Sequence, residues 1–500
     1  MSADWPLVSL ADLYDIRSGL SKPAKDFGSG YPFLSFKDVF YNFFVPDKLT
    51  ELVQTSERER ESFSVQRGDV FLTRTSETIN ELGMSCVALK DYEQATFNGF
   101  TKRLRPKRGT VLLPEYVGYY LRSPSFRKEM MAFSTLMSTR ASLNNEMISR
   151  LKLLVPPRKD QETIARVLKS LDDKIELNRQ INQTLEEMAQ AIFKSWFVDF
   201  EPIKAKIEAK VGGQDPERAA MCAISGAVQG CTNVAGARTA AATKTDAELD
   251  QLEAQGRANA ASAGSAGAAP QDQFAQLRTT AALFPDELTD SELGLIPNGW
   301  TWKSLDTIAN YQNGLALQKY RPEDENDFLP IVKIAQLKAG EATSAEKASP
   351  NINLACIIDN GDVVFSWSGS LLVDIWCGGK AALNQHLFKV TSEDYPKWFY
   401  LYWTKHHLAK FQQIAADKAV TMGHIKRSHL KEAMCAVPDF DFEKLNIMSY
   451  LIDKQVAVRL ECTSLTKLRD TLLPRLLSGD LGMLAEKENA VSTYQQGISA

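Results

Sequence analysis

Basic side chains gather in one short stretch that could contact nucleic acid. The stretch TKRLRPKR (101–108) is the most basic in the chain's first part. Lys102, Arg103 and Arg105 are our candidates for contacts with backbone phosphates, which attract clustered Lys and Arg. A solvated strand end explains the same stretch equally well. The stretch alone therefore does not decide between a nucleic-acid site and an ordinary surface.

Loops rich in hydroxyl, amide and basic side chains form a second group of candidates. STLMSTRASLNN (134–145) corresponds to AVTMGHIKRSH (419–429), and FLTRTSET (71–78) corresponds to VFSWSGS (364–370). Such side chains bind base edges and phosphates, although each loop alone could be an ordinary surface loop. The candidate DNA contacts here are Arg74, Thr75, Ser138, Thr139, Arg140, Ser366, Trp367, Thr421, His424, Lys426 and Arg427.

The motifs of several enzyme classes are missing. WCGGKAA (376–382) contains Gly379-Lys380, but Ala381 stands where a phosphate loop needs Ser or Thr. LVPPRK (154–159) has two prolines without the flanking residues of an adenine-methylase motif. The histidines show no H-E-x-x-H spacing, and no cysteine lies in ligand register. We therefore expect no catalytic residue, no metal site and no bound cofactor.

Composition limits the class of protein further. Five hundred residues predict two to four domains. The net charge of −4 excludes a globally basic protein, so a nucleic-acid site must be local. Seven cysteines without a C-x-x-C pair, no signal-like start and no apolar run of ~18 residues predict a cytoplasmic protein with reduced thiols.

The chain repeats itself at long range. Each half reads as short β-rich runs and helices, followed by a long helical stretch, so the fold class is α+β with two similar domains. The framework agrees between the halves while the loops differ, which is the pattern of one scaffold that reads two sequences. The matching stretches are WPLVSLADLYDIRSGL (5–20) with WTWKSLDTIANYQNGL (300–315), RGDVFLTRTS (67–76) with NGDVVFSWSG (360–369), and TFNGFTKRL (96–104) with ALNQHLFKV (382–390).

The two long helical stretches carry matching apolar seams. In the first, roughly 160–200, Ile164, Leu168 and Leu171 step by four and three, and the pattern resumes after a polar interruption at Asn178. One such stripe also fits a core helix of a bundle. Because it occurs twice, we expect the two helices to pack on each other as an antiparallel coiled coil with a pseudo-twofold internal repeat.

The end of the first helix carries more apolar surface than a helix pair needs. KSWFVDF (194–200) covers most faces of its turn with large side chains. Exposed surface of this kind marks protein interfaces. The predicted partner-docking residues are Ile192, Trp196, Phe197, Phe200 and Leu472.

An Ala/Gly/Ser-rich stretch separates the halves, and its composition predicts a flexible linker that buries no core. The expected organisation is a first domain at 1–157, a helical spacer at 158–202, the linker at 203–290, a second domain at 291–438, a second helical spacer at 439–480 and a tail at 481–500.

The order of these parts resembles the specificity subunits of type I restriction-modification enzymes, over about residues 1–480. This resemblance implies two target recognition domains that each read one half of a bipartite DNA target. It also implies that the two helices set the spacer between the half-targets and dock methyltransferase subunits. The residues that carry it are LLVPPRKDQETIARVLKSLDDKIELNRQINQTLEEMAQAIFKSWFVDFEP (153–202), DSELGLIPNGW (290–300), NGDVVFSWSG (360–369) and LNQHLFKV (383–390).

The resemblance also implies partners and cofactors. Two methyltransferase subunits would bind S-adenosylmethionine and methylate adenine N6, and motor-nuclease subunits would use ATP and Mg²⁺ to cleave unmodified DNA. The chain itself would be non-catalytic. One departure is internal: Gly99-Phe100 stand where the second half has Gln385-His386, so the two pairs need not share one role.

Two other interpretations stay open at this stage. A duplicated coiled-coil adaptor without DNA reading would have the same helices, and partner-dependent, sequence-specific DNA binding would exclude it. A self-contained DNA methylase or nuclease would need the motifs that are missing. Methyl transfer by the chain alone would favour that second alternative.

Overall fold

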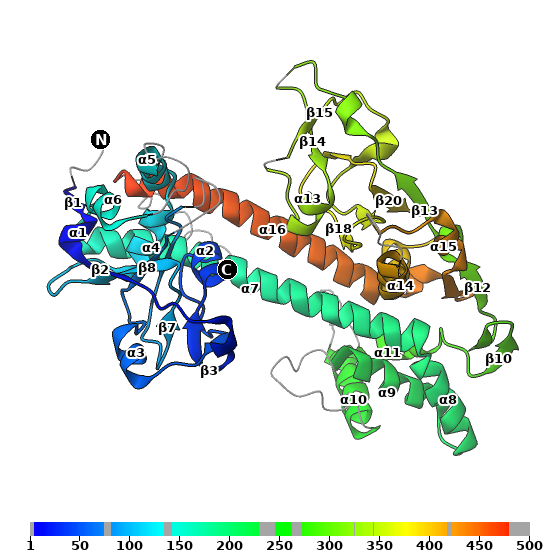
Figure 1. Cartoon of the computed structure of the whole chain (residues 1–500). Helices are drawn as coiled ribbons and strands as arrows, with labels where there is room; N and C mark the ends of the chain where they lie inside the picture. The colour runs from blue at the N-terminus through cyan, green and yellow to red at the C-terminus, as the bar shows by residue number, and fades with distance from the viewer. Residues whose placement is uncertain are drawn as a thin grey trace. The chain divides into compact units, whose positions relative to one another are not determined.

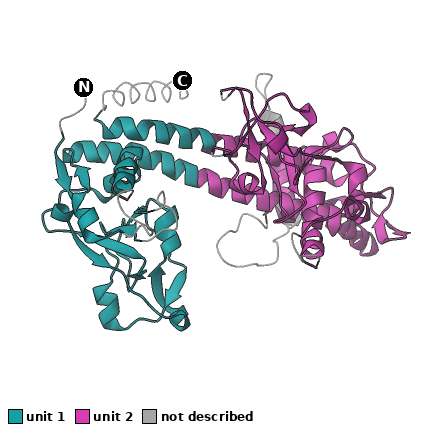
Figure 2. Ribbon diagram, turned by 45° about the horizontal axis from the view of Figure 1, so that its top comes forward, with its two compact units in different colours: residues 1–176, 463–500 teal, residues 177–462 magenta. Residues whose placement is uncertain are grey.

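The computed structural model describes residues 5–74, 82–134, 143–229, 246–262, 273–324, 326–343, 345–417 and 423–479. The chain divides into two compact units, unit 1 (residues 1–176 and 463–500) and unit 2 (residues 177–462), which Figure 2 colours separately. Two long helices, α7 (Arg158–Phe193) and α16 (Asn446–Leu477), each contribute residues to both units. None of the described helices is long and apolar enough to cross a membrane.

Unit 1 contains two small sheets and a strand pair. The antiparallel first sheet has, in spatial order, β2 (Tyr14–Ser18), β8 (Thr101–Pro106), β5 (Val70–Thr73) and β6 (Ser85–Val87). The second sheet has β4 (Glu51–Val53), β3 (Phe27–Leu34) and β7 (Thr96–Phe97). β1 (Leu7–Ser9) pairs with β9 (Lys152–Leu154), which closes the domain just before α7 begins.

Unit 2 repeats this arrangement. Its antiparallel first sheet has β13 (Asn310–Asn313), β20 (Leu387–Thr391), β17 (Val363–Ser366) and β18 (Val373–Ile375). Its second sheet has β15 (Lys347–Ala348), β14 (Leu329–Val332), β19 (Ala381–Leu383) and β16 (Ile357–Ile358). β12 (Thr301–Ser304) pairs with β21 (Met434–Val437), and a hairpin of β10 (Leu288–Ser291) and β11 (Gly294–Pro297) precedes it.

The two topologies correspond strand for strand. β3 pairs with β7 in parallel, as β14 does with β19, whereas the other pairs in both units are antiparallel. Unit 2 adds β16 at the edge of its second sheet. The predicted α+β fold with an internal repeat is therefore confirmed by the strand pairing.

Short helices complete each domain, and local sequence explains where several begin. Ser35 and Asp38 form a capping box at α2, and Pro114 opens α4 at a position where no intrahelical hydrogen bond is lost. The helices of unit 1 are α1 (Leu10–Leu13), α2 (Phe36–Tyr41), α3 (Glu57–Ser62), α4 (Pro114–Arg122), α5 (Pro124–Ser134) and α6 (Asn145–Arg150). Those of unit 2's domain are α12 (Leu305–Ile308), α13 (Ile334–Ala339), α14 (Lys397–Asp417) and α15 (Arg427–Glu432).

In unit 1 the first part of α7 packs antiparallel to the last part of α16. Arg469 of α16 forms an ion pair with Asp172 of α7 at 2.8 Å. Leu168, one turn earlier in α7, shares a buried cluster with Leu472 and Leu476, which come later in α16. The contacts advance in opposite directions along the two helices, as the sequence predicts. Full burial of each leucine contributes about 1.5–3 kcal/mol.

In unit 2 the last part of α7 packs antiparallel to the first part of α16. The buried Asn178 donates a hydrogen bond from its side-chain nitrogen to Glu461, at 2.9 Å. Ile192, later in α7, shares a buried cluster with Met448 and Leu451, which lie earlier in α16. The polar interruption noted in the sequence is thus part of the packed seam, where a buried amide favours one register over others.

The predicted flexible linker at 203–290 is wrong for the part of it that the structure describes. This part forms four helices, α8 (Glu201–Val211), α9 (Pro216–Gln229), α10 (Asp246–Ser262) and α11 (Gln273–Ala281), and Figure 1 shows α9, α10 and α11 side by side. Residues 230–245 and 263–272, and the predicted tail at 481–500, lie outside the described residues.

A few larger side chains explain why an alanine-rich stretch folds here. Met221 and Ile224 of α9 and Leu249 of α10 are almost fully buried in the main cluster of unit 2. Lys206 of α8 is buried as well, with an ion pair to Glu217 at 2.6 Å. These helices add their apolar faces to an existing core, so they do not need the composition of an independent domain.

Candidate nucleic-acid interface

Three segments of unit 1 meet at one end of its first sheet. The backbone N–H of Arg74, just after β5, donates to the carbonyl of Phe100 in the turn between β7 and β8, at 2.8 Å. The N–H of Leu143, which precedes α6, donates to the carbonyl of Arg74, also at 2.8 Å. We call the meeting point of Arg74, Phe100 and Leu143 the first junction.

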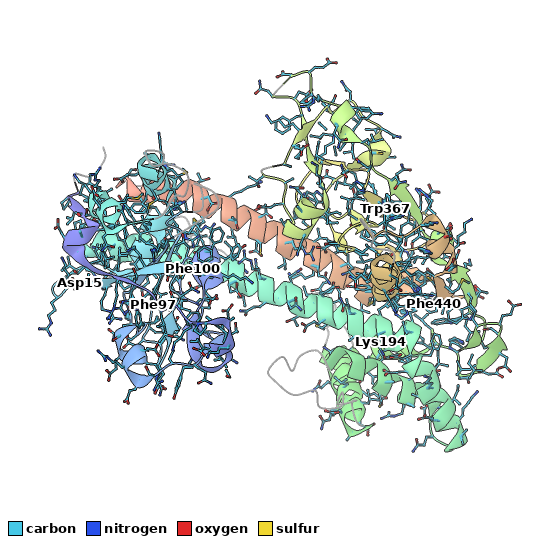
Figure 3. The ribbon with its side chains drawn as sticks, viewed as in Figure 1. Asp15, Phe97, Phe100, Lys194, Trp367 and Phe440 are labelled. Carbon is cyan, nitrogen blue, oxygen red and sulfur yellow. The ribbon has the colours of Figure 1, made fainter. Side chains whose placement is uncertain are left out.

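Unit 2 builds the same meeting point from the corresponding segments. The N–H of Trp367, just after β17, donates to the carbonyl of His386 at 3.3 Å. The N–H of Ile425 donates to the carbonyl of Trp367 at 3.0 Å. We call the meeting point of Trp367, His386 and Ile425 the second junction. Figure 3 labels Phe100 and Trp367, one from each junction.

A repeated asparagine shapes the turn in both junctions. The side-chain oxygen of Asn98 accepts a hydrogen bond from the N–H of Phe100 at 2.6 Å. The side-chain oxygen of Asn384 accepts one from the N–H of His386 at 3.3 Å. These bonds hold the second residue after each asparagine in the same backbone setting, whatever its side chain.

The backbone of the repeated Gly-Leu pair lies in close contact with the same turn. A Cβ atom on Gly19 would lie 2.0 Å from the carbonyl oxygen of Asn98, and one on Gly314 would lie 2.3 Å from that of Asn384. No side chain fits at those distances, so only glycine lets the two backbones approach. This close contact explains why both halves repeat Gly-Leu at this point of the sequence.

Exposed side chains at the first junction are aromatic and basic. Phe100 is 63% exposed, and Arg74 is exposed beside it. Asn145, at the start of α6, accepts a hydrogen bond at 2.7 Å from Lys102, whose side chain is buried. Burial lowers the pKa of Lys102, and the nearby charge of Arg74 lowers it further. The predicted contacts Thr75, Ser138, Thr139 and Arg140 lie outside the described residues.

The basic side chains of β8 form hydrogen bonds inside unit 1. This finding corrects the prediction that they contact phosphates. Arg103 donates to the carbonyl of Ser64 at 2.7 Å, and burial lowers its pKa to about 10. Arg105 donates two hydrogen bonds, at 2.7 and 2.6 Å, to the fully buried carboxylate of Asp69. Lys102 is likewise turned inward. Lys102 lies on the opposite face of β8 from Arg103 and Arg105, and segments distant in the sequence cover both faces, which a count of basic residues does not reveal.

Side chains at the second junction form a different set. The ring of Trp367 lies 5.9 Å from that of His386 and 6.3 Å from that of His424, between centroids. The hydroxyl of Ser368 lies 2.9 Å from Nδ1 of His386 and can form a hydrogen bond with it. The second junction therefore has imidazole rings beside a half-buried indole, where the first junction has an exposed phenyl ring and an exposed guanidinium.

The remaining candidates of unit 2 divide between surface and framework. Lys426 and His424 are exposed. Arg427 is exposed too, but its guanidinium donates to the carbonyl of Tyr311 at 3.0 Å and lies over the ring of Phe388. Ser366 is fully buried and donates to the carbonyl of Ser368, which corrects its assignment as a DNA contact. Thr421 lies outside the described residues.

Phe100 and His386 were absent from the candidate residues chosen on sequence alone. Their signal was available: each stands two positions after a repeated asparagine, and the halves differ most sharply there. Among the described residues, no cluster of three or more His, Cys, Asp or Glu side chains could hold a metal ion.

Comparisons with known proteins agree with this interpretation. Residues 2–187 match the family model described as the type I restriction modification DNA specificity domain. The chain is 26% identical to the type I restriction enzyme HindI specificity subunit of Haemophilus influenzae, over 96% of this chain and 100% of that protein. It is 22% identical to the MjaIX specificity subunit of Methanocaldococcus jannaschii, over 96% of this chain and 94% of that protein.

The chain is thus similar over nearly its whole length to specificity subunits of type I restriction enzymes. The expected family is thereby confirmed, and subunits of this kind work with DNA in type I restriction-modification complexes. The proteins that it matches are named as specificity subunits, and like them the chain is not itself an enzyme. A solved structure of the S subunit from M. genitalium aligns with 95% of this chain and 96% of its own, at a TM-score of 0.45 and 11% identity.

The aromatic end of α7 is covered by the chain's own fold, which corrects the predicted docking surface. Trp196 and Phe197 are 1% and 0% exposed, and they lie in a π-helical turn, Lys194–Val198, where they contact Phe284, Trp300 and Trp398. Ile192 and Phe200 are buried in the same cluster of unit 2, and Leu472 is buried in unit 1. The surplus apolar surface therefore belongs to the domain core, so it gives no reason to place a partner there.

Proposed function

We propose that this specificity subunit reads a two-part DNA sequence, with one junction for each part. The observation that carries the proposal is that two equivalent sets of backbone hydrogen bonds present different side chains. Arg74 and Phe100 occupy the places that Trp367 and His386 occupy in the other unit. A scaffold repeated in this way, with divergent side chains at the same positions, suits recognition of two different base sequences.

The long helices support a second part of the proposal, that α7 and α16 set the number of base pairs between the two half-targets. α7 is 36 residues long, or about 54 Å at ~1.5 Å per residue, and both helices contribute to both units. The hydrogen bond from the buried Asn178 to Glu461 favours one register of the helices. A fixed register would give a fixed spacer.

The partners of the complex belong to the same proposal. Two methyltransferase subunits, which bind S-adenosylmethionine, and motor-nuclease subunits, which use ATP and Mg²⁺, would supply the chemistry that this chain does not. A cytoplasmic location follows from work on chromosomal and incoming DNA.

Methylation mapping tests the proposal directly. The chain is expressed with its methyltransferase partner in cells that lack other adenine methylation, and methylated adenines are mapped across the genome. We expect one discontinuous target with two defined parts and a constant gap. The matched control is the methyltransferase without this chain. A continuous target, or methylation that does not depend on the chain, would contradict the proposal.

A second measurement addresses the alternatives that the sequence left open. The purified chain is incubated alone with labelled S-adenosylmethionine and DNA, and we expect no methyl transfer. Transfer by the chain alone would support a self-contained methylase. An adaptor without DNA reading would leave the methylated sequence unchanged when the chain is replaced by another specificity subunit.

A further inference from the structure

We propose that the second residue after the repeated asparagine, Phe100 in unit 1 and His386 in unit 2, makes a base contact that distinguishes the two half-targets. This inference rests on the proposed function and names the residues and base groups through which it acts. Phe100 would pack against the C5-methyl group of a thymine. His386 would form a hydrogen bond with the major-groove edge of a purine.

The backbone at this position is held in place from two sides. The N–H of Phe100 is bound by the Asn98 side chain, and its carbonyl accepts from the N–H of Arg74. His386 has the corresponding bonds from Asn384 and Trp367. A side chain on such a fixed backbone loses little conformational freedom when it meets a ligand, which favours specific recognition.

Phe100 has the exposure and the neighbour that a base contact needs. Its side chain is 63% exposed, beside the exposed Arg74. A single exposed phenylalanine is ordinary on a protein surface. This one, however, stands at a position held by hydrogen bonds from two other segments and beside a cation that can bind phosphate. Apolar contact with the thymine methyl group is the base-specific interaction available to a phenyl ring in the major groove.

His386 is prepared for a polar contact instead. The hydroxyl of Ser368 lies 2.9 Å from its Nδ1, and the ring lies beside Trp367. The other ring nitrogen, Nε2, lies at the long distance of 3.5 Å from the side-chain nitrogen of Gln385. With Nδ1 bound to Ser368, the ring orientation is set and Nε2 can meet a polar base edge. Purines carry N7 and O6 or N6 on that edge.

Reciprocal variants test the inference by exchanging the two side chains. Phe100→His and His386→Phe are each assembled with the partner subunits, and the methylated target is mapped. We expect Phe100→His to change base preference in one half-target only, and His386→Phe to change it in the other half only. Discrimination at the affected base should fall by about tenfold, and the gap between the halves should stay constant.

Matched controls separate a base contact from a general effect of the substitution. Tyr41→His changes an aromatic side chain of unit 1 that is 73% exposed and lies outside the junction, and we expect an unchanged target. Ser368→Ala removes the hydroxyl beside His386 and should relax the same half-target as His386→Phe, by a smaller factor. If His386→Phe does not assemble, His386→Asn keeps a polar group on the same backbone and should again alter only that half.

The possible outcomes distinguish the inference from the function on which it rests. If the wild-type chain directs no discontinuous methylation, the proposed function fails. If it does, but both reciprocal variants keep the wild-type base preference in both halves, only the inference is overturned. A uniform loss of methylation at all sites, with no change in base preference, would likewise overturn it, because such a loss indicates a phosphate contact.

Discussion

The first and second junctions share their backbone hydrogen bonds and differ in almost every exposed side chain. Phe100 and Arg74 face solvent in unit 1, where unit 2 has His386 and Trp367. The repeated asparagine and glycine keep the turn constant. The difference teaches that the scaffold and the recognition surface are separable. Backbone atoms and buried residues form the turn, whereas the parts that vary are side chains, exposed at Arg74 and Phe100 and half-buried at Trp367 and His386.

The helix seams of the two units show a second contrast. In unit 1 the seam is largely leucine, with Leu168 fully buried. In unit 2 it includes the buried Asn178, and the half-buried carboxylate of Glu186 joins α7 to Lys405 and Tyr402 of α14. Burial by itself would raise the pKa of Glu186, but the charge and hydrogen bonds of Lys405, with those of Gln190 and Tyr402, lower it overall. Both seams thus combine apolar packing with a polar contact between α7 and α16, an ion pair of Arg469 with Asp172 in unit 1 and a hydrogen bond of Asn178 with Glu461 in unit 2.

The largest effect is expected from a substitution that disrupts the leucine seam. Leu168→Asp would bury a carboxylate without a partner and should destabilise unit 1 by about 3–5 kcal/mol, while unit 2 keeps its stability. The measurement is urea unfolding followed by hydrogen exchange, with exchange resolved for each unit. Leu177→Asp is the matched control on the same helix, because Leu177 is 51% exposed and should tolerate the change. Equal losses for both variants would contradict the seam.

The next largest effect is expected at acidic pH, where unit 2 should lose more stability than unit 1. All five histidines of the chain lie in residues 386–429, within unit 2. Burial, with the charge of His406, lowers the pKa of His407 to about 4, so its folded form binds a proton less readily than the unfolded form. The stability due to this group is therefore complete above about pH 6.5 and is lost as the pH falls toward 4, by up to about 3 kcal/mol.

A variant without this titration checks the acid effect. His407→Gln should remove most of the stability loss between pH 6.5 and pH 4, although it also alters the hydrogen bond of His407 with the Met434 carbonyl. Stability is measured by urea unfolding at several pH values, with pH 8 as the reference at which neither protein is protonated at this position. If the unfolding free energies of wild type and variant fall equally between pH 6.5 and pH 4, His407 is excluded as the cause.

The glycines under the two turns offer a test in which both halves should respond alike. Gly19→Ala and Gly314→Ala each place a Cβ atom against a backbone carbonyl, at 2.0 and 2.3 Å. Because the backbone has to shift, each should destabilise its own unit by about 1–3 kcal/mol. Gly212→Ala is the control for alanine substitution, since its φ of −81° suits alanine and its added Cβ would meet only ordinary contacts, at 3.5 and 3.7 Å. A loss in only one unit would break the equivalence of the junctions.

The smallest effect on stability concerns the polar residue of the second seam. Asn178→Leu should change the unfolding free energy by less than about 1 kcal/mol, because an apolar side chain replaces a buried amide. It should, however, reduce the preference for one helix register. Spin labels at the exposed positions Arg179 and Ala457, both in unit 2, should give a broader distance distribution in the variant. An unchanged distribution would mean that the apolar contacts alone set the register.

Part of this molecule could be predicted from its sequence. The repeat, the α+β class, the apolar seams of α7 and α16 and the family all follow from local patterns: strand and turn signals, helical spacing and matched stretches. The repeated Gly-Leu pair and the repeated asparagine also mark the turn that both junctions use. These features are visible in sequence because they depend on backbone geometry, which a few residue types determine at short range.

Other properties were decided only by the tertiary structure. Arg103 and Arg105 point into unit 1, Trp196 and Phe197 enter a core, and the alanine-rich helix α9 folds against that core. In each case the environment of the side chain comes from segments distant in the sequence, such as Ser64 for Arg103 and Trp398 for Phe197. Composition measures what a segment could bury or expose. Whether it does so depends on the surfaces that the rest of the chain brings to it, because burial is a property of the packed assembly and not of the segment alone.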